Sequence, residues 1–225
     1  MGRNSTSVAC ISAVEASPSK GEGVPKDHSE AVKWYRLAAE RGHAEAQFSL
    51  GGMYSEGEGV PQDYREAYKW YRLAAEQGYA DAQFYLGDMY SEGEGVPQDY
   101  REAYKLYRLA AEQGHARALF TLGGMYFRGR GVPQDHNEAV KWFRLAAEQG
   151  DADAQFNLGV MYANGQGVPE DYVQAHLWFN LAGAAGDGSA RGSRDKVAAK
   201  MTPAQIAEAQ ALAREWRPKV NSPAR

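Results

Sequence analysis

The sequence repeats itself every 36 residues, and this period restricts the chain to a small group of folds. Two strings, Leu-Ala-Ala-Glu and Leu-Gly-x-Met-Tyr, each recur four times at that spacing. A third string, Gly-Val-Pro, recurs at Gly23, Gly59, Gly95, Gly131 and Gly167. A strict period of this length indicates an array of small units, each of which packs mainly against its neighbours.

Each period is predicted to hold two helices. The second helix begins after Asp63, an N-cap residue, and Glu66 stands at the partner position of a capping box. This helix is predicted to end at Gly78. Its apolar residues recur at i, i+3, i+4 and i+7, which places them on one face: Ala67, Trp70, Tyr71 and Ala74.

The first helix of a pair is predicted over about residues 44–56. Its core face consists of Ala46, Leu50, Met53 and Tyr54. The loop that follows, Gly57-Glu58-Gly59-Val60-Pro61, separates it from the second helix. Neither helix can bury its apolar face alone, but stacked neighbours can. We therefore predict an all-α solenoid of 36-residue helix-turn-helix repeats.

The two ends of the chain depart from the repeat. Residues 1–22 match the first-helix pattern poorly, and we expect them to be frayed or partly helical. The repeats extend over residues 23–186. Capping helices are expected over 187–218, the last of them opened by Thr202, Pro203 and Gln205 as N-cap, N1 and N3, and residues 219–225 form a tail.

The repeat resembles that of the Sel1-like repeat family, a relative of the tetratricopeptide solenoids. The shared pattern over residues 46–78 reads AQFxLGxxYxxGxGVPxDxxxAxxWYxxAAxxG. The resemblance implies a right-handed α/α superhelix whose first helices line the concave side. It also implies adaptor or scaffold work in assembling complexes, often in bacteria. A secreted subgroup carries a disulfide in each repeat, and the single Cys10 does not fit that subgroup.

No catalytic residue, cofactor or metal site is predicted. Asp63 and Glu66 could act as an acid–base pair, but helix capping explains them. The Gly57-Glu58-Gly59 loop follows a helix and lacks the Gly-Lys-Ser/Thr of a phosphate-binding loop. Metal-ligand spacing is missing from the histidines, which are interpreted mainly as residues at helix ends: His28, His43, His115, His136 and His176.

The exposed face of the first helices is where the repeats differ. At about 100° per residue, positions 45, 49, 52 and 56 point away from the core face. The face is acidic in the first units, basic in the third and polar in the fourth. The candidate binding residues are Glu45, Ser49, Asp81, Tyr85, Asp88, Arg117, Thr121, Arg128, Asp153 and Asn157. A protein or peptide with a basic and an acidic part would suit this face; neutral variation of a solvated surface is the alternative.

Three functional hypotheses follow. The first is a scaffold that binds a protein partner in a concave groove; the second is a cell-envelope enzyme or accessory factor; the third is a repeat module of a larger protein. A net charge of −4 gives no basic stripe for nucleic acid, and no run of apolar residues is long enough to span a membrane. We expect a monomer. The lack of an apolar run near Cys10 favours the cytoplasm, or the periplasm or a secreted location if a leader precedes the sequence.

Overall fold

The computed structural model describes residues 28–219, and the predictions for residues 1–22 and for most of the tail lie outside this range. The described part contains eleven helices and no strand, which confirms the all-α prediction. It divides into two compact units, residues 28–99 and 100–219. Unit 1 holds α2 (His28–Glu40), α3 (Ala44–Glu56), α4 (Tyr64–Glu76) and α5 (Ala80–Glu92). Unit 2 holds α6 (Tyr100–Glu112), α7 (Ala116–Arg128), α8 (His136–Glu148), α9 (Ala152–Asn164), α10 (Tyr172–Ala184), α11 (Gly188–Ala198) and α12 (Pro203–Glu215).

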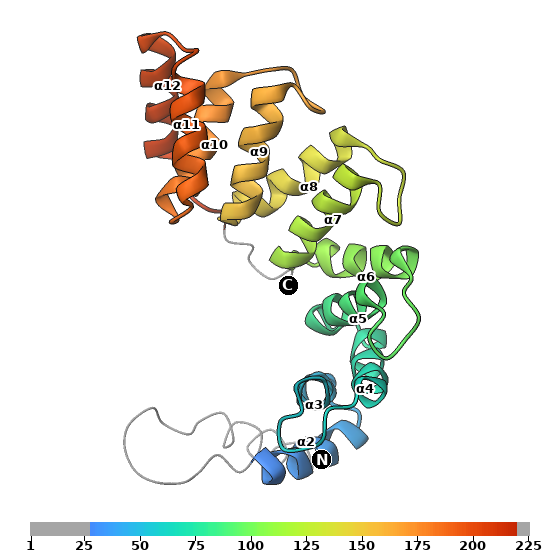
Figure 1. Ribbon diagram of the computed structural model, residues 1–225. Coiled ribbons are helices and arrows are strands. Elements are labelled where there is room, and N and C mark those ends of the chain that lie inside the picture. The colour runs from blue at the N-terminus through green and yellow to red at the C-terminus, as the bar shows by residue number, and fades with distance from the viewer. Residues whose placement is uncertain (1–27, 220–225) are drawn as a thin grey trace, which may run out of the picture. The chain divides into compact units, whose positions relative to one another are not determined.

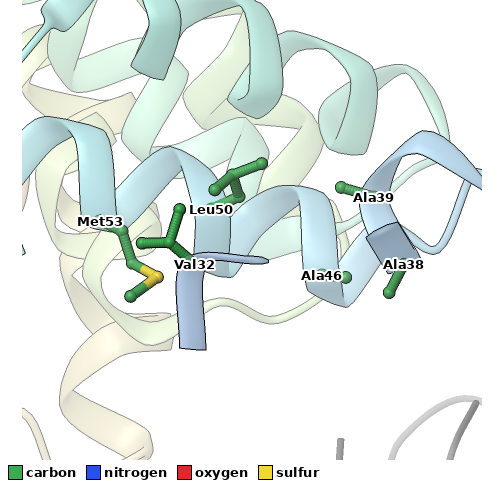
Figure 2. Packing of buried hydrophobic residues seen from close by; sticks show 6 residues of the cluster. All are labelled: Val32, Ala38, Ala39, Ala46, Leu50 and Met53. Carbon is green, nitrogen blue, oxygen red and sulfur yellow. The ribbon is translucent and has the colours of Figure 1, made fainter. Parts of the chain in front are cut away.

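Within each unit, consecutive helices up to α11 pack against each other, as the helix-pair pattern predicts, and α12 packs mainly against α10 (Figure 1). The even-numbered helices α2 to α10 are the predicted second helices, and the odd-numbered helices α3 to α9 are the predicted first helices. In unit 1, the core between α2 and α3 is built from Val32, Ala38, Ala39, Ala46, Leu50 and Met53 (Figure 2). Small alanines alternate with larger side chains there, so the two helices can approach closely.

The predicted core faces are confirmed except at their edges. Ala46, Leu50, Ala67 and Ala74 are fully buried. Trp70 and Tyr54 are only partly buried, and the Tyr54 hydroxyl accepts a hydrogen bond from Arg36. An aromatic side chain with a polar tip commonly packs its body and leaves the tip at the surface.

A glycine on the first helix allows the second helix to pack flat against it. A Cβ atom at Gly51 would lie 2.6 Å from Cδ1 of Tyr71, which is too close for any real side chain. The same relation holds in unit 2, where a Cβ at Gly123 would lie 2.6 Å from Cδ1 of Phe143. The glycine of the Leu-Gly pair in the repeat therefore leaves the space that an aromatic ring of the partner helix occupies.

The capping prediction is half right. The Asp63 carboxylate accepts the backbone N–H of Arg65 at 2.9 Å and that of Glu66 at 3.2 Å, as an N-cap should. The return bond of a capping box does not form, because the backbone N–H of Asp63 donates to the carbonyl of Tyr54 at 2.9 Å. The Glu66 carboxylate pairs with Lys69 instead.

The C-terminal helices close unit 2. Thr202 and Gln205 form a complete capping box with Pro203 at the helix start, as predicted. Helix α10 packs against both α11 and α12. After α12 the chain returns to α8, where the backbone N–H of Lys219 donates to the carbonyl of Glu148 at 2.7 Å and the Lys219 ammonium reaches the Glu148 carboxylate at 2.9 Å.

Candidate functional site

The ten candidate binding residues lie on the four first helices α3, α5, α7 and α9. Five belong to unit 1, namely Glu45, Ser49, Asp81, Tyr85 and Asp88, and five to unit 2, namely Arg117, Thr121, Arg128, Asp153 and Asn157. All ten are exposed or partly exposed. Their role in binding stays a prediction, and so does the continuous concave groove.

Unit 1 brings together four aromatic rings from three parts of the chain. The Phe48 ring of α3 lies 5.5 Å from the Tyr85 ring of α5 and 5.3 Å from the Tyr79 ring, measured between centroids. Tyr71 of α4 stacks on Tyr85 at 5.7 Å with 22° between the planes. Tyr71 is buried, whereas the other three rings are partly exposed. We call these four residues the aromatic group.

Two carboxylates, Glu56 and Asp88, lie on the same helices as Phe48 and Tyr85 of the aromatic group. Burial raises the pKa of the Tyr71 hydroxyl well above its usual value, and the charges of Tyr85, Glu56 and Asp88 raise the pKa further. Asp88 lies one helical turn after Tyr85 on α5, and Glu56 lies one turn after Gly52 on α3, where a Cβ atom would be 3.6 Å from the Tyr71 hydroxyl. Helices α3 and α5 carry no basic side chain, and their acidic residues are Glu45, Glu56, Asp81, Asp88 and Glu92.

Unit 2 presents the opposite charge on α7. This helix has no acidic side chain, and Arg117 and Arg128 are exposed on it. Gly124 is buried, and a Cβ atom there would lie 2.9 Å from a guanidinium nitrogen of Arg128. The Arg128 side chain therefore folds back along the helix over Gly124, which lays its charge across the predicted face.

The fourth helix of the predicted face, α9, is polar. Asp153 lies in its first turn and is exposed. The Asn157 side chain donates a hydrogen bond to the backbone carbonyl of Asp153 at 2.9 Å. The predicted face of α9 thus carries one acidic group, Asp153, and two amides, Asn157 and Asn164.

Tyr85 is among the candidate binding residues predicted from the sequence, but the sequence did not place Phe48, Tyr71 and Tyr79 beside it. Phe48 and Tyr71 belong to columns that are aromatic in every repeat, so they were interpreted as core or not singled out. The available signal was Tyr79, because the matching positions hold His43, His115 and Asp151. Only the packing of α3, α4 and α5 shows that a second variable tyrosine joins the same cluster.

The His and acidic side chains considered for metal or acid–base chemistry have the following surroundings in the described residues. No cluster of three or more His, Cys, Asp or Glu side chains that could hold a metal ion occurs among residues 28–219. His176 is buried in α10, where burial lowers the pKa of its ring; Arg194 lowers that pKa further and Asp195 raises it. The Asp63 and Asp135 carboxylates serve as helix caps.

Across residues 28–219, no helix combines the length and the apolar character needed to cross a lipid bilayer.

Comparison with known proteins identifies the repeat. The Sel1 repeat model matches five consecutive segments: 19–43, 44–79, 80–115, 116–151 and 152–187. The chain belongs to the Sel1 repeat family. Repeats of this family generally form protein-interaction scaffolds, and the fold is typically non-enzymatic. No match was found among curated proteins.

Two solved Sel1 repeat structures are similar to this chain. One is c5321, a protective antigen of uropathogenic Escherichia coli with an SLR fold, which is 38% identical with a TM-score of 0.80 over 93% of this chain and 45% of its own. The other is a Sel1 repeat protein from Oxalobacter formigenes, which is 41% identical with a TM-score of 0.71 over 77% of this chain and 50% of its own. The chain thus spans about half the length of both. The immunity protein PA5088 from Pseudomonas aeruginosa, 20% identical with a TM-score of 0.54 over 96% of this chain and 83% of its own, shares the fold.

Proposed function

We propose that this Sel1 repeat protein is a non-enzymatic scaffold that binds a protein partner through the exposed faces of its first helices. The observation that carries the proposal is the contrast between the helices. The second helices repeat the same exposed ion pairs, such as Arg72–Glu76 and Arg108–Glu112. The first helices α5 and α7 keep most of their buried residues and change charge at exposed positions.

Surface ion pairs within a helix stabilise that helix by only a few tenths of a kcal/mol. Because they are the same in successive repeats, they do not distinguish one binding partner from another. Charges that differ from one helix to the next, on a face with partly exposed rings, provide the complementarity that selects a partner. The acidic face of unit 1 and the basic face of α7 suit a partner with a basic and an acidic segment. The chain is also compatible with a module of a longer protein, since it spans about half of its two relatives.

The test compares charge reversals on the two kinds of helix. The full chain, an Arg117→Glu/Arg128→Glu variant and a control Arg108→Glu/Arg144→Glu variant would each be used to capture proteins from lysate of the source cells. All three must show the same circular dichroism and melting temperature. We expect a specific protein to be lost from the first variant and retained by the control, whose reversals lie on α6 and α8. Equal capture by all three would contradict the proposal and direct attention to the second helices.

A further inference from the structure

We propose that the aromatic group of unit 1, with Glu56 and Asp88 beside it, binds an arginine or lysine side chain of a basic peptide segment. The inference rests on the proposed scaffold function and names the chemistry of the partner at one of its faces. The site consists of Phe48 and Tyr85 on the two first helices and Tyr79 at the turn before α5, over the buried ring of Tyr71.

The rings offer faces to a ligand. Phe48, Tyr79 and Tyr85 are all partly exposed. The ring centroid of Phe48 lies 5.3 Å from that of Tyr79 and 5.5 Å from that of Tyr85. Stacking on Tyr71 fixes the plane of the Tyr85 ring. A ring held in place loses little conformational entropy when a ligand packs on it. The π faces of such rings attract cations within about 6 Å of the centroid.

Charge selects the kind of ligand. Every ionisable side chain that α3 and α5 carry, apart from tyrosine, is acidic. Helix α4 carries three basic residues, of which Lys69 pairs with Glu66 and Arg72 with Glu76, so that only Arg65 offsets the five carboxylates of α3 and α5. The field over the rings is therefore negative, and an acidic or a purely apolar segment would bind less well there than a basic one.

Unit 2 supplies an internal contrast at the same positions. Its ring pair Phe120 and Phe143 lies at 5.6 Å, much like Phe48 and Tyr71 at 5.7 Å. In the matching register, Asn157 stands in the place of Tyr85 and Asp151 in that of Tyr79, while Arg117 and Arg128 replace Glu45 and Glu56 at the two ends of the first helix. The core of the repeat is thus kept in both units, while the additional rings and the negative charge belong to unit 1.

The probe is a synthetic nonapeptide with arginine at alternate positions, and its matched control carries citrulline, which keeps the shape and removes the charge. Binding to the full chain would be measured by fluorescence anisotropy at low salt. We expect the citrulline peptide to bind at least tenfold more weakly. Tyr85→Ala should weaken the arginine peptide about tenfold, whereas Tyr85→Phe, which keeps the ring, should stay within about twofold.

Two further variants test whether a loss of binding reflects the site itself and not a misfolded protein. Asp88→Asn changes charge with little change in shape and should weaken the arginine peptide severalfold, while Thr121→Ala on α7 should leave it unchanged. Equal affinity for the arginine and citrulline peptides, or an unchanged affinity in both Tyr85→Ala and Asp88→Asn, would overturn the inference.

The two proposals can fail separately. If the Arg117→Glu/Arg128→Glu variant loses a captured partner while the native chain does not bind the arginine peptide, the scaffold function stands and the basic-peptide site is wrong. If the peptide binds as expected and capture is equal in all variants, the unit 1 site stands and the role of α7 is wrong.

Discussion

Helices α5 and α7 hold the same place in consecutive repeats and show which positions the fold controls. Both have 13 residues and end at a left-handed glycine, Gly93 with φ 77° and Gly129 with φ 70°. Four buried residues are the same in both helices, namely Ala82/Ala118, Leu86/Leu122, Gly87/Gly123 and Met89/Met125, and a buried Gln83 in α5 matches a buried Leu119 in α7. Phe84 is buried where Phe120 is partly exposed, and Gly124 is buried where Asp88 is partly exposed. The exposed positions, in contrast, are acidic on α5 and basic on α7. Burial fixes a residue because its neighbours fix its volume, and exposure leaves it free to serve a partner.

Gln83 and Leu119 are an exception to the rule that buried positions keep their residue and exposed positions change. The Gln83 amide donates to the carbonyl of Ala75 at 3.3 Å, and Gln47 and Gln155 make the same bond to Ala39 and Ala147. Leu119 is buried at that position without a polar group. A buried position can therefore change its chemistry when the polar side chain and its replacement have similar volume.

The largest expected effect tests whether the two cores are equivalent. Leu86→Ala and Leu122→Ala should each lower the free energy of unfolding of their unit by about 2–5 kcal/mol, because a buried leucine leaves a cavity. Urea denaturation, with hydrogen exchange to localise the loss, measures both. Leu109→Ala is the control, since this leucine is 47% exposed. A cost below about 1 kcal/mol at Leu122 would show that α7 is not a core helix equivalent to α5.

The second prediction concerns the glycine that admits a ring. Gly51→Ala in unit 1 and Gly123→Ala in unit 2 should each destabilise by about 1–3 kcal/mol through overpacking against Tyr71 or Phe143. The control Gly52→Ala places a Cβ at 3.6 Å from the Tyr71 hydroxyl, an ordinary contact. It should be neutral or stabilising by up to about 1 kcal/mol, because alanine is the better helix former. Thermal unfolding distinguishes these outcomes, and equal effects at Gly51 and Gly52 would contradict the packing account.

The third prediction separates the two acidic residues at the start of a second helix. Asp63→Ala and Asp135→Ala should each cost about 1 kcal/mol, because two backbone N–H groups lose their acceptor. Glu66→Gln should cost less than about 0.5 kcal/mol, since its partner Lys69 is exposed. If Glu66→Gln were as costly as Asp63→Ala by urea denaturation, Glu66 would have a role in the cap that the structure does not show.

A pH-dependent effect is expected for unit 2. Burial of His176 lowers its folded-state pKa, so the unfolded chain takes up a proton first as the pH falls below about 6.5. The contribution to stability is complete above that value and is lost as the pH falls through the folded pKa. Urea melts between pH 7.5 and pH 5 should show this loss in the native chain and not in His176→Phe. Leu109→Ala, which removes an exposed side chain that does not titrate, is the control and should keep the native pH dependence.

The smallest effect on stability is expected from substitutions that change only the exposed face of α7. Replacing Arg117, Thr121 and Arg128 with the α5 residues, as Arg117→Asp/Thr121→Tyr/Arg128→Glu, should alter the free energy of unfolding by only about 0.5 kcal/mol. A stability loss above about 2 kcal/mol would show that the α7 face is part of the fold after all.

The sequence alone determined the helix pairs, their boundaries within a residue or two, and most of the core. These follow from local periodicity and from glycines and aspartates at helix ends, which act over a few residues and repeat five times along the chain. The sequence also marked the exposed positions at which repeats differ.

Tertiary packing decided what the sequence could not. The capping box at Asp63 failed because a carbonyl at the end of α3 takes the N–H that Glu66 needed. Phe48, Tyr71, Tyr79 and Tyr85 met because three separate segments pack together in unit 1. Both results depend on atoms 9 to 37 positions apart in the sequence, and a periodic pattern records which face a residue occupies but not which side chain lies opposite it.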